Sequence, residues 1–304
     1  MNNIISTKAR VFRNLKDYKF VLKLSNEQKE EISEKLSKIF SKFSLISLSS
    51  ADANVIKVLK NNNLISQNTN NVLLSKDENV SVNLFEEEHV TIVATSQGYD
   101  KTIFSKVKNL ADELADKISL SYSDQYGYLM SDISKVGAGI KLDCQICLPS
   151  IKELNKIDQI KQNIRQLGYV LKETNSPTIY QLSTICNLGY SEKEIFEEFD
   201  KMVQKLQDLE VESAKMLDVT NHDVILDRTM RSLAILNSCY LMTSEELKNL
   251  LINLRTGANL GMVNIDTKKL NQLQVLSNSN LSEFVSATET KELAEKVKNI
   301  LKGE

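Results

Sequence analysis

The fold is decided by residues 70–95, which read NNVLLSKDENVSVNLFEEEHVTIVAT. Three runs rich in aliphatic and β-branched residues, NNVLLS, VSVNLF and HVTIVAT, are separated by short charged segments. Runs of this length and composition, bounded by polar turns, are typical of strands joined by tight connections. We therefore predict an antiparallel sheet, in which the charged segment 86–89 lies at a turn that enters a strand.

Helical periodicity surrounds this predicted sheet. Apolar residues recur at helical spacing after Ser25, a candidate N-cap, and Gly168 takes the place of a C-terminal glycine cap. We predict helices over residues 25–43, 103–118 and 151–167, and further strands within 137–148 and 178–189. Mixed helices and antiparallel strands indicate the α+β class.

The pattern changes at Ser191, where SEKE at 191–194 forms a capping box before a long helical run. A second capping box, Thr243 to Glu246, opens another helix, and helical periodicity continues to Leu301. No Pro- or Gly-rich linker intervenes. We predict an α+β domain over residues 1–218 and a small all-helical domain over 219–304.

Composition restricts the classes of function. A chain of 304 residues, 41% hydrophobic and 26% charged, is long enough for a sizeable core and ordinary for a globular protein. A net charge of -2 argues against a general nucleic-acid binder. No apolar run is long enough for a membrane span, and residues 1–20 lack the apolar core of a signal peptide. A cytoplasmic location is therefore expected.

Four cysteines, Cys144, Cys147, Cys186 and Cys239, are scattered over a large chain, where disulfides are not the default. The CxxC pair at 144 and 147 has neither a second pair nor a histidine cluster beside it. We expect buried or half-buried structural thiols and no metal site.

Four stretches, in order along the chain, resemble the bacterial protein arginine kinases (the McsB family), which share the phosphagen kinase fold. They are ISTKARVFRNLKDYKF, NLFEEEHVTIV, YGYLMSDISKVGAGIKLDCQICLPSI and TIYQLSTICNLGYSEKEI. The helical tail from residue 226 to 263 is also similar to that family. The resemblance implies a phosphagen-kinase-like antiparallel sheet flanked by helices, a small helical C-terminal domain, and an ancestry in ATP-dependent phosphorylation of arginine.

The family's nucleotide site survives here only as remnants. By resemblance they are Ser6, Thr7, Lys8, Arg10, Asn63, Thr91 and Lys141. Lys8 and Lys141 replace phosphate-binding arginines and Thr91 replaces a third, while Asn63 replaces a histidine at the nucleotide. Lysine cannot supply the planar two-pronged contact of arginine, so phosphate binding should be weakened.

The acidic motif is better preserved. Glu86, Glu87 and Glu88 match the family's carboxylates, and Glu87 is the closest counterpart of the catalytic base. Asp132, however, stands where the family has a reactive cysteine. The segment GYVLKETNSPTIYQ is also about six residues too short for the family's arginine- and glutamate-bearing loop, and Glu173 is not a convincing substitute.

These losses predict a catalytically inactive relative, a pseudokinase kept as a scaffold, with no bound cofactor. Loss of even one positioned cation from a phosphoryl-transfer site commonly costs about 10²-fold or more. The tail segment 287–301 contains no arginine, so we do not expect it to bind phosphoarginine. By resemblance, the expected partner is the zinc-binding activator McsA, with a homodimer through the tail and a role in spore coat assembly or in stress-related protein quality control.

Two other hypotheses about function remain open. A divergent active arginine kinase could rebuild the Mg-ATP site from Lys8, Arg10, Lys135 and Lys141. Alternatively, the surviving acids could bind guanidinium groups without any nucleotide. We expect His89 to be a hydrogen-bonded structural residue, and GAG at 137–139 to form a tight backbone turn rather than a phosphate loop.

Overall fold

An antiparallel sheet forms the centre of the molecule. The computed structural model describes residues 3–76, 79–176, 178–278 and 287–303. Within these, eight strands pair in the order β2-β3-β4-β5-β1-β8-β10-β9, every neighbour antiparallel. The strands are β1 Ile4–Arg13, β2 Ser44–Ser47, β3 Asn71–Leu74, β4 Val80–Leu84, β5 Val90–Gln97, β8 Ile140–Cys147, β9 Tyr169–Glu173 and β10 Ile179–Thr184. β6 Tyr122–Ser123 and β7 Gly127–Tyr128 form a separate hairpin. The predicted antiparallel sheet is confirmed.

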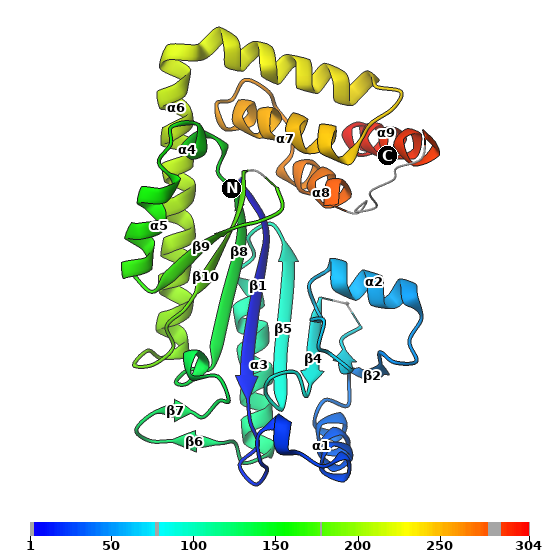
Figure 1. Cartoon of the computed structure of the whole chain (residues 1–304), viewed down its shortest axis with the longest axis vertical. Coiled ribbons are helices and arrows are strands. Elements are labelled where there is room, and N and C mark those ends of the chain that lie inside the picture. Colours follow the sequence, from blue (N-terminus) through cyan, green and yellow to red (C-terminus); the bar gives the residue numbers. More distant parts are fainter. Residues whose placement is uncertain (1–2, 77–78, 177, 279–286, 304) are drawn as a thin grey trace.

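Helices cover one face of this sheet, the helix at residues 53–61 packs on the other face, and further helices build the second part of the chain (Figure 1). They are α1 Asn26–Ile39, α2 Ala53–Asn61, α3 Thr102–Lys117, α4 Pro149–Glu153, α5 Ile157–Gln166, α6 Glu192–Ser238, α7 Ser244–Asn259, α8 Thr267–Asn278 and α9 Ala287–Lys302. α3 packs on β1 and β5, α5 on β9, and the first half of α6 on β8. None of the helices within the described ranges is both long and apolar enough to cross a membrane.

Strand alternation separates an apolar face from a polar one. In β1, Ala9 and Val11 are buried in the main core beneath the helices, whereas Lys8 and Arg10 are only partly buried. Successive strand residues point to opposite faces, so Lys8 and Arg10 lie on the face that α3, α5 and α6 leave uncovered. Asp143 of β8 pairs with Lys8 and shares this face. The sheet thus presents a polar surface on the side away from its main core.

Two sequence-based expectations need correction, and a third is confirmed. The helix predicted over 151–167 is two helices, α4 and α5, because Asn155 takes a left-handed backbone conformation (φ 55°) between them. Cys186 is exposed, not buried, because it follows β10 in a surface loop, while Cys144 and Cys147 are buried in β8 as free thiols. Gly168 does follow the end of α5 with φ 83°, as a glycine cap requires.

α6 joins the two parts of the molecule. Ser191 and Glu194 form the predicted capping box at its start, and Asn221 leaves helical geometry (φ -134°, ψ 27°) where the helix kinks. Beyond the kink, α6 packs with α7, α8 and α9 around a second core. Asn271 of α8 donates to the carbonyl of Ile4 (3.0 Å), which attaches this helical part to the start of β1.

A buried carboxylate anchors α4 on α6. Glu210 is 0% exposed, and its two oxygens accept the backbone N–H groups of Ser150 (2.8 Å) and Ile151 (3.0 Å). These are donors at the start of α4 that the helix itself cannot satisfy. Burial raises the pKa of Glu210 to about 7, although both N–H donors act in the opposite direction.

This raised pKa predicts a pH-dependent stability. Because the folded-state pKa of Glu210 lies above the ordinary value of 4.5, the native state binds the proton more tightly than the unfolded chain. Glu210 therefore contributes fully to the free energy of unfolding below about pH 4.5. Roughly 3 kcal/mol of this contribution is lost as pH rises through about 7.

Chemical denaturation of wild type and Glu210→Gln across pH 5 to 8 measures this effect. The difference between their unfolding free energies should decline with pH, because the glutamine does not titrate. A difference that stays constant over this range would contradict the assignment to Glu210.

Candidate functional site

A polar cleft of about 730 Å³ lies over the open sheet face, where the two parts of the molecule meet. It is lined by Ile5, Ser6, Thr7, Lys8, Asn61, Asn62, Asn63, Asn79, Thr95, Ser96, Gln97, Asp100, Lys106, Gln145, Thr174, Asn175, Ser176, Ile179, Lys248 and Val275. Amides and hydroxyls dominate this lining. Lys248 of α7 and Val275 of α8 show that the helical part contributes one wall, a contribution that no motif in the sequence indicated.

Four of the seven nucleotide remnants line this cleft. Ser6, Thr7 and Lys8 come from β1, and Asn63 follows the end of α2 with a left-handed backbone (φ 56°). Thr7 is buried and donates to the carbonyl of Gly98 (2.8 Å), so its hydroxyl already has a partner within the protein. The sequence resemblance thus selected residues that tertiary structure brings together.

Arg10, the one arginine kept from the family's first motif, is held by an acid. Its Nη2 lies 2.6 Å from Oδ2 of Asp143, a side chain only 7% exposed. Asp143 is fixed in turn by Gln181 (3.0 Å) and Ser183 (2.5 Å) of β10. Burial opposes ionisation of Asp143, yet Arg10, Ser183 and Lys141 keep the pKa of its carboxyl below the ordinary value.

The charged forms of Lys8 and Lys141, the two lysines that replace arginines, are electrostatically disfavoured. Burial and the neighbouring Arg10 lower the pKa of Lys8 to about 8. The same two causes lower the pKa of Lys141, which pairs with Arg10 across β1 and β8. Lys8 makes no ion pair in the described part of the chain. Both lysines are therefore weaker cations than free lysine.

Thr91 occupies the position of the third lost arginine. It lies on β5 opposite Phe12 and is 1% exposed, and its hydroxyl has no hydrogen-bond partner among the described residues. A buried threonine cannot deliver a charge to a ligand. Arg10, Thr91 and Lys141 do not line the cleft described above.

The three glutamates of the acidic motif point to three different partners. Glu86 accepts from Ser66 (2.8 Å), Thr69 and Asn83 (3.2 Å), between the end of α2 and the strand β4. Glu88 is fully buried and holds the loop before residue 133 by accepting from Ser131 and Asn14. Glu86 and Glu88 are thus part of the local framework at the β4–β5 turn.

Glu87, the counterpart of the catalytic base, is 62% exposed and ion-paired with Lys135. Lys135 is itself 8% exposed, lies 3.7 Å from Asp132, and sits 4.6 Å from the centre of the Phe12 ring. This lysine is therefore engaged by an acid and an aromatic face. It is poorly placed to rebuild a phosphate site.

The short connection before β10 is a tight turn. Thr174 donates its backbone N–H to Ile179 (3.2 Å), joining β9 to β10 across residues 174–179, of which residue 177 lies outside the described ranges. Glu173 points to Lys161 (2.7 Å) on α5 instead of into the cleft. The turn therefore leaves Glu173 outside the candidate site.

His89 and the GAG turn have the structural roles expected of them. His89 is fully buried, accepts the N–H of Leu15 at Nδ1 (3.0 Å), and bonds the Lys19 carbonyl through Nε2 (2.7 Å). Gly137 has φ 113°, and a Cβ there would lie 2.4 Å from the carbonyl oxygen of Asn187. Only glycine fits that backbone contact.

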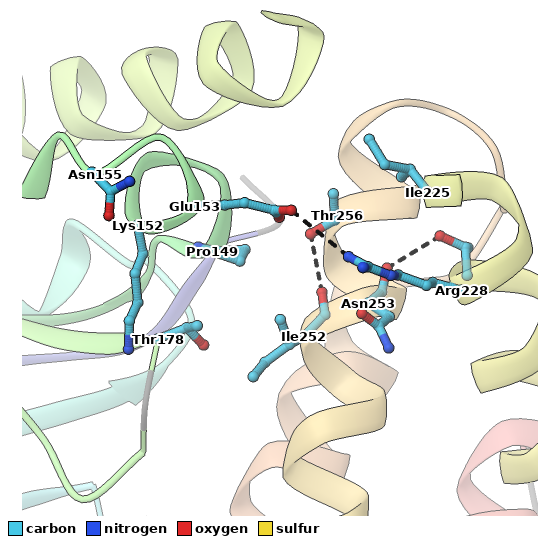
Figure 2. A pocket seen from close by; sticks show the side chains of 11 residues that line it. Pro149, Lys152, Glu153, Asn155, Thr178, Ile225, Arg228, Ile252, Asn253 and Thr256 are labelled. Atoms are coloured by element: carbon cyan, nitrogen blue, oxygen red, sulfur yellow. Dashed lines mark hydrogen bonds and ion pairs between the residues drawn. The ribbon is translucent and has the colours of Figure 1, made fainter. Parts of the chain in front are cut away.

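A second concavity, of about 390 Å³, lies between α4 and the helical part (Figure 2). Arg228 of α6 approaches Glu153 of α4 across it (3.7 Å), and Thr229, Ile252 and Thr256 line the helical side. Both partners of this ion pair are more than half exposed, so it adds little to stability.

No cluster of His, Cys, Asp and Glu able to hold a metal occurs in the part of the chain described here.

The sheet, its helical cover and the remnants on the open face define a guanidino phosphotransferase scaffold. Residues 23–213 match the family model for the ATP:guanido phosphotransferase C-terminal catalytic domain, and residues 222–304 match the protein-arginine kinase McsB C-terminal domain. The chain belongs to the ATP:guanido phosphotransferase family, and its predicted resemblance to bacterial protein arginine kinases is confirmed.

Curated relatives extend over most of the chain. Protein-arginine kinase of Bacillus subtilis (strain 168) is 29% identical over 295 residues, which is 90% of this chain and 81% of the relative. The protein-arginine kinase of Staphylococcus aureus (strain USA300) is also 29% identical, over 287 residues, 90% of this chain and 85% of its own length. These matches include both parts of the molecule.

Solved structures share the fold. The substrate-free duplicated taurocyamine kinase of Schistosoma mansoni superposes with a TM-score of 0.64 at 17% identity over 81% of this chain, which spans 39% of that kinase. Lombricine kinase superposes with a TM-score of 0.62 at 16% identity. The match covers 68% of this chain and 66% of the lombricine kinase chain. The predicted phosphagen kinase fold is thereby confirmed.

Proposed function

We propose that this chain is a catalytically inactive homologue of protein arginine kinase that acts as a cytoplasmic scaffold. The observation that carries the proposal is the internal engagement of its remaining charges. Arg10 is bound to Asp143, and Lys135 is bound to Glu87. ATP brings about four negative charges, and phosphoryl transfer depends almost entirely on positioned cations to neutralise them. Such cations are depleted here.

The proposal extends to partners by family membership. A McsA-like zinc-binding protein is the proposed partner, and the helical part is the proposed surface for homodimer formation. Spore coat assembly and protein quality control are the two proposed settings. Support comes from the match of residues 222–304 to the McsB C-terminal domain and from the well-packed second core of that part.

Calorimetric titration with Mg-ATP and a phosphoarginine assay test the loss of catalysis. We expect no saturable heat at millimolar nucleotide and no phosphoarginine on an arginine-rich protein substrate, with or without a McsA-like partner. An active family member assayed in parallel is the positive control. Phosphoarginine formed at a rate comparable with that control would refute the proposal.

One observation favours a second candidate, a divergent active kinase that uses Mg-ATP. Lys8 faces the cleft, makes no ion pair in the described ranges, and lies close enough to Arg10 for its pKa to fall. A cation cluster short of anions can attract phosphate. This candidate requires nucleotide binding that disappears in Lys141→Ala and phosphoarginine formation that disappears in Glu87→Gln.

A guanidinium sensor is the third candidate. Binding of arginine-rich peptides without nucleotide, weakened by Glu87→Gln, would separate it from the other two. The exposure of Glu87 supports this candidate.

A further inference from the structure

Three lysines face the cleft over the open sheet face from three different elements. Lys8 lies on β1, Lys106 on α3 and Lys248 on α7. None of them forms an ion pair with a carboxylate in the described part of the chain. Asp100 is the one acid among the described lining residues, and it already accepts the backbone N–H (2.9 Å) and the hydroxyl (2.8 Å) of Thr102. The lining therefore carries a net positive charge.

These lysines are spread along the cleft instead of gathered at one point. The charged groups that act most strongly on Lys8 all lie on β1, on β8 or in the β4–β5 turn, and neither Lys106 nor Lys248 is among them. Coulomb energy falls with separation, so these two lysines lie further from Lys8. In Figure 1, α7 likewise lies beyond the end of the sheet at which β1 begins. A small anion reaches only part of this charge, whereas an extended acidic chain can reach all of it.

Side-chain amides supply much of the remaining lining. Six of them make no side-chain hydrogen bond with any other described residue: Asn61, Asn62, Asn63, Asn79, Gln97 and Asn175. Each amide both donates and accepts, as a peptide group does. The oxygens of a phosphate chain only accept, so they leave the amide carbonyls unmatched. The amides therefore favour a polypeptide over a phosphate chain.

Two other occupants fit this cleft less well. None of its described lining residues is aromatic, so it lacks the stacking platform on which nucleobases are commonly held. A second copy of the chain offers its acidic runs 86–88 and 192–198 in the β4–β5 turn and in α6, and neither run is extended. A separate acidic segment matches both the charge and the amides.

We propose that this cleft binds an extended acidic segment of a partner protein. Its carboxylates pair with Lys8, Lys106 and Lys248, and its backbone bonds to the side-chain amides. Because Lys248 belongs to the helical part, the bound segment bridges that part to the sheet. This inference does not rest on the loss of catalysis, since Lys106 and Lys248 are not nucleotide remnants, and the phosphoarginine assay does not decide it.

A rhodamine-labelled peptide of nine residues that alternates glutamate and serine is the probe, measured by fluorescence anisotropy with the full chain. We expect Lys106→Gln and Lys248→Gln each to weaken peptide binding about threefold, and the double variant about tenfold, because distant sites contribute additively. Lys108→Gln is the matched control. Lys108 lies on the same helix as Lys106 but outside the cleft, paired with Asp112 (2.6 Å), so this variant should bind as wild type does.

Carbodiimide cross-linking of the peptide to the wild-type chain locates the site even if a variant does not fold. Mass spectrometry should find the peptide carboxylates joined to Lys106 and Lys248. Adducts confined to lysines outside the cleft would overturn the proposal.

Competition separates a peptide from a small anion. Unlabelled acidic peptide should displace the probe at concentrations at least about tenfold lower than sodium tripolyphosphate, because only the peptide reaches all three lysines. Equal displacement by tripolyphosphate, no binding at millimolar peptide, or equal binding by the double variant would each contradict the proposal. A wild-type dimer that the double variant converts to monomer in sedimentation would assign the cleft to a second copy, and so also overturn it.

Discussion

Replacing Arg13 by alanine is expected to lower the free energy of unfolding by about 3–5 kcal/mol, because a buried cation and its partners are separated. Arg13 is 1% exposed and ion-paired with Glu192 at the start of α6. Its guanidinium also donates to the carbonyls of Phe12 (2.7 Å) and Ala138 (3.1 Å) and stacks 3.6 Å from the centre of the Tyr128 ring. One side chain thus joins β1, the GAG turn, β7 and α6.

Urea denaturation measures this loss, with Arg231→Ala as the matched control. Arg231 also pairs with a carboxylate, Asp227 (2.9 Å), but its side chain is 75% exposed. Exposed pairs contribute at most about 1 kcal/mol. Equal losses in the two variants would show that burial of Arg13 does not determine its contribution.

Replacing Glu88 by alanine is expected to cost about 3 kcal/mol, because a fully buried carboxylate that accepts several hydrogen bonds is removed and its donors lose that acceptor. Glu88 is 0% exposed and accepts from Asn14 (2.6 Å), from the backbone N–H of Ser131 (3.0 Å) and from the Ser131 hydroxyl (2.7 Å). The carboxylate therefore fixes the loop between β7 and residue 133 against the β4–β5 turn.

Glu87→Ala, measured by the same denaturation, is the control for Glu88→Ala. Glu87 is the adjacent acid in the same motif but is largely exposed, and its partner Lys135 keeps Asp132 at 3.7 Å, so its loss should change the unfolding free energy by less than about 1 kcal/mol. The reverse order of effects would contradict a structural role for Glu88 and the minor contribution expected of the exposed Glu87 side chain.

The acidic motif therefore has an unequal division of roles. Of the three carboxylates that resemblance to arginine kinases identified, Glu88 and Glu86 are held in hydrogen-bond networks, and Glu87 is largely exposed. Preservation of the motif is explained by folding as well as by ancestry. An intact EEEH sequence is accordingly weak support for catalysis.

Local sequence was sufficient for much of the fold. Short β-rich runs bounded by charged turns in 70–95 predicted antiparallel strands, and the capping boxes at Ser191 and Thr243 predicted the helix starts that the structure contains. These features depend on near neighbours in the chain, which is why a pattern records them. β2, α2 and β9 lack strong periodicity or are short, and the sequence did not reveal them.

The motif resemblance identified seven candidate nucleotide residues, and four of them line one cleft. It did not identify Asp143 as the partner of Arg10, or Lys248 as part of the cleft wall. Both depend on strands and helices distant in sequence. The state of the remaining cations could not be inferred from residue type alone.

By itself, then, the sequence determined the α+β class, the family and the loss of arginines at Lys8, Thr91 and Lys141. Only the tertiary structure decided that Arg10 is bound by Asp143, that Glu87 is bound by Lys135, and that lysines of three elements line one cleft. The physical reason is that periodicity and motifs follow the chain. Charge pairing, burial and strand order depend on residues that the sheet brings together from more than a hundred positions apart or places at its boundary.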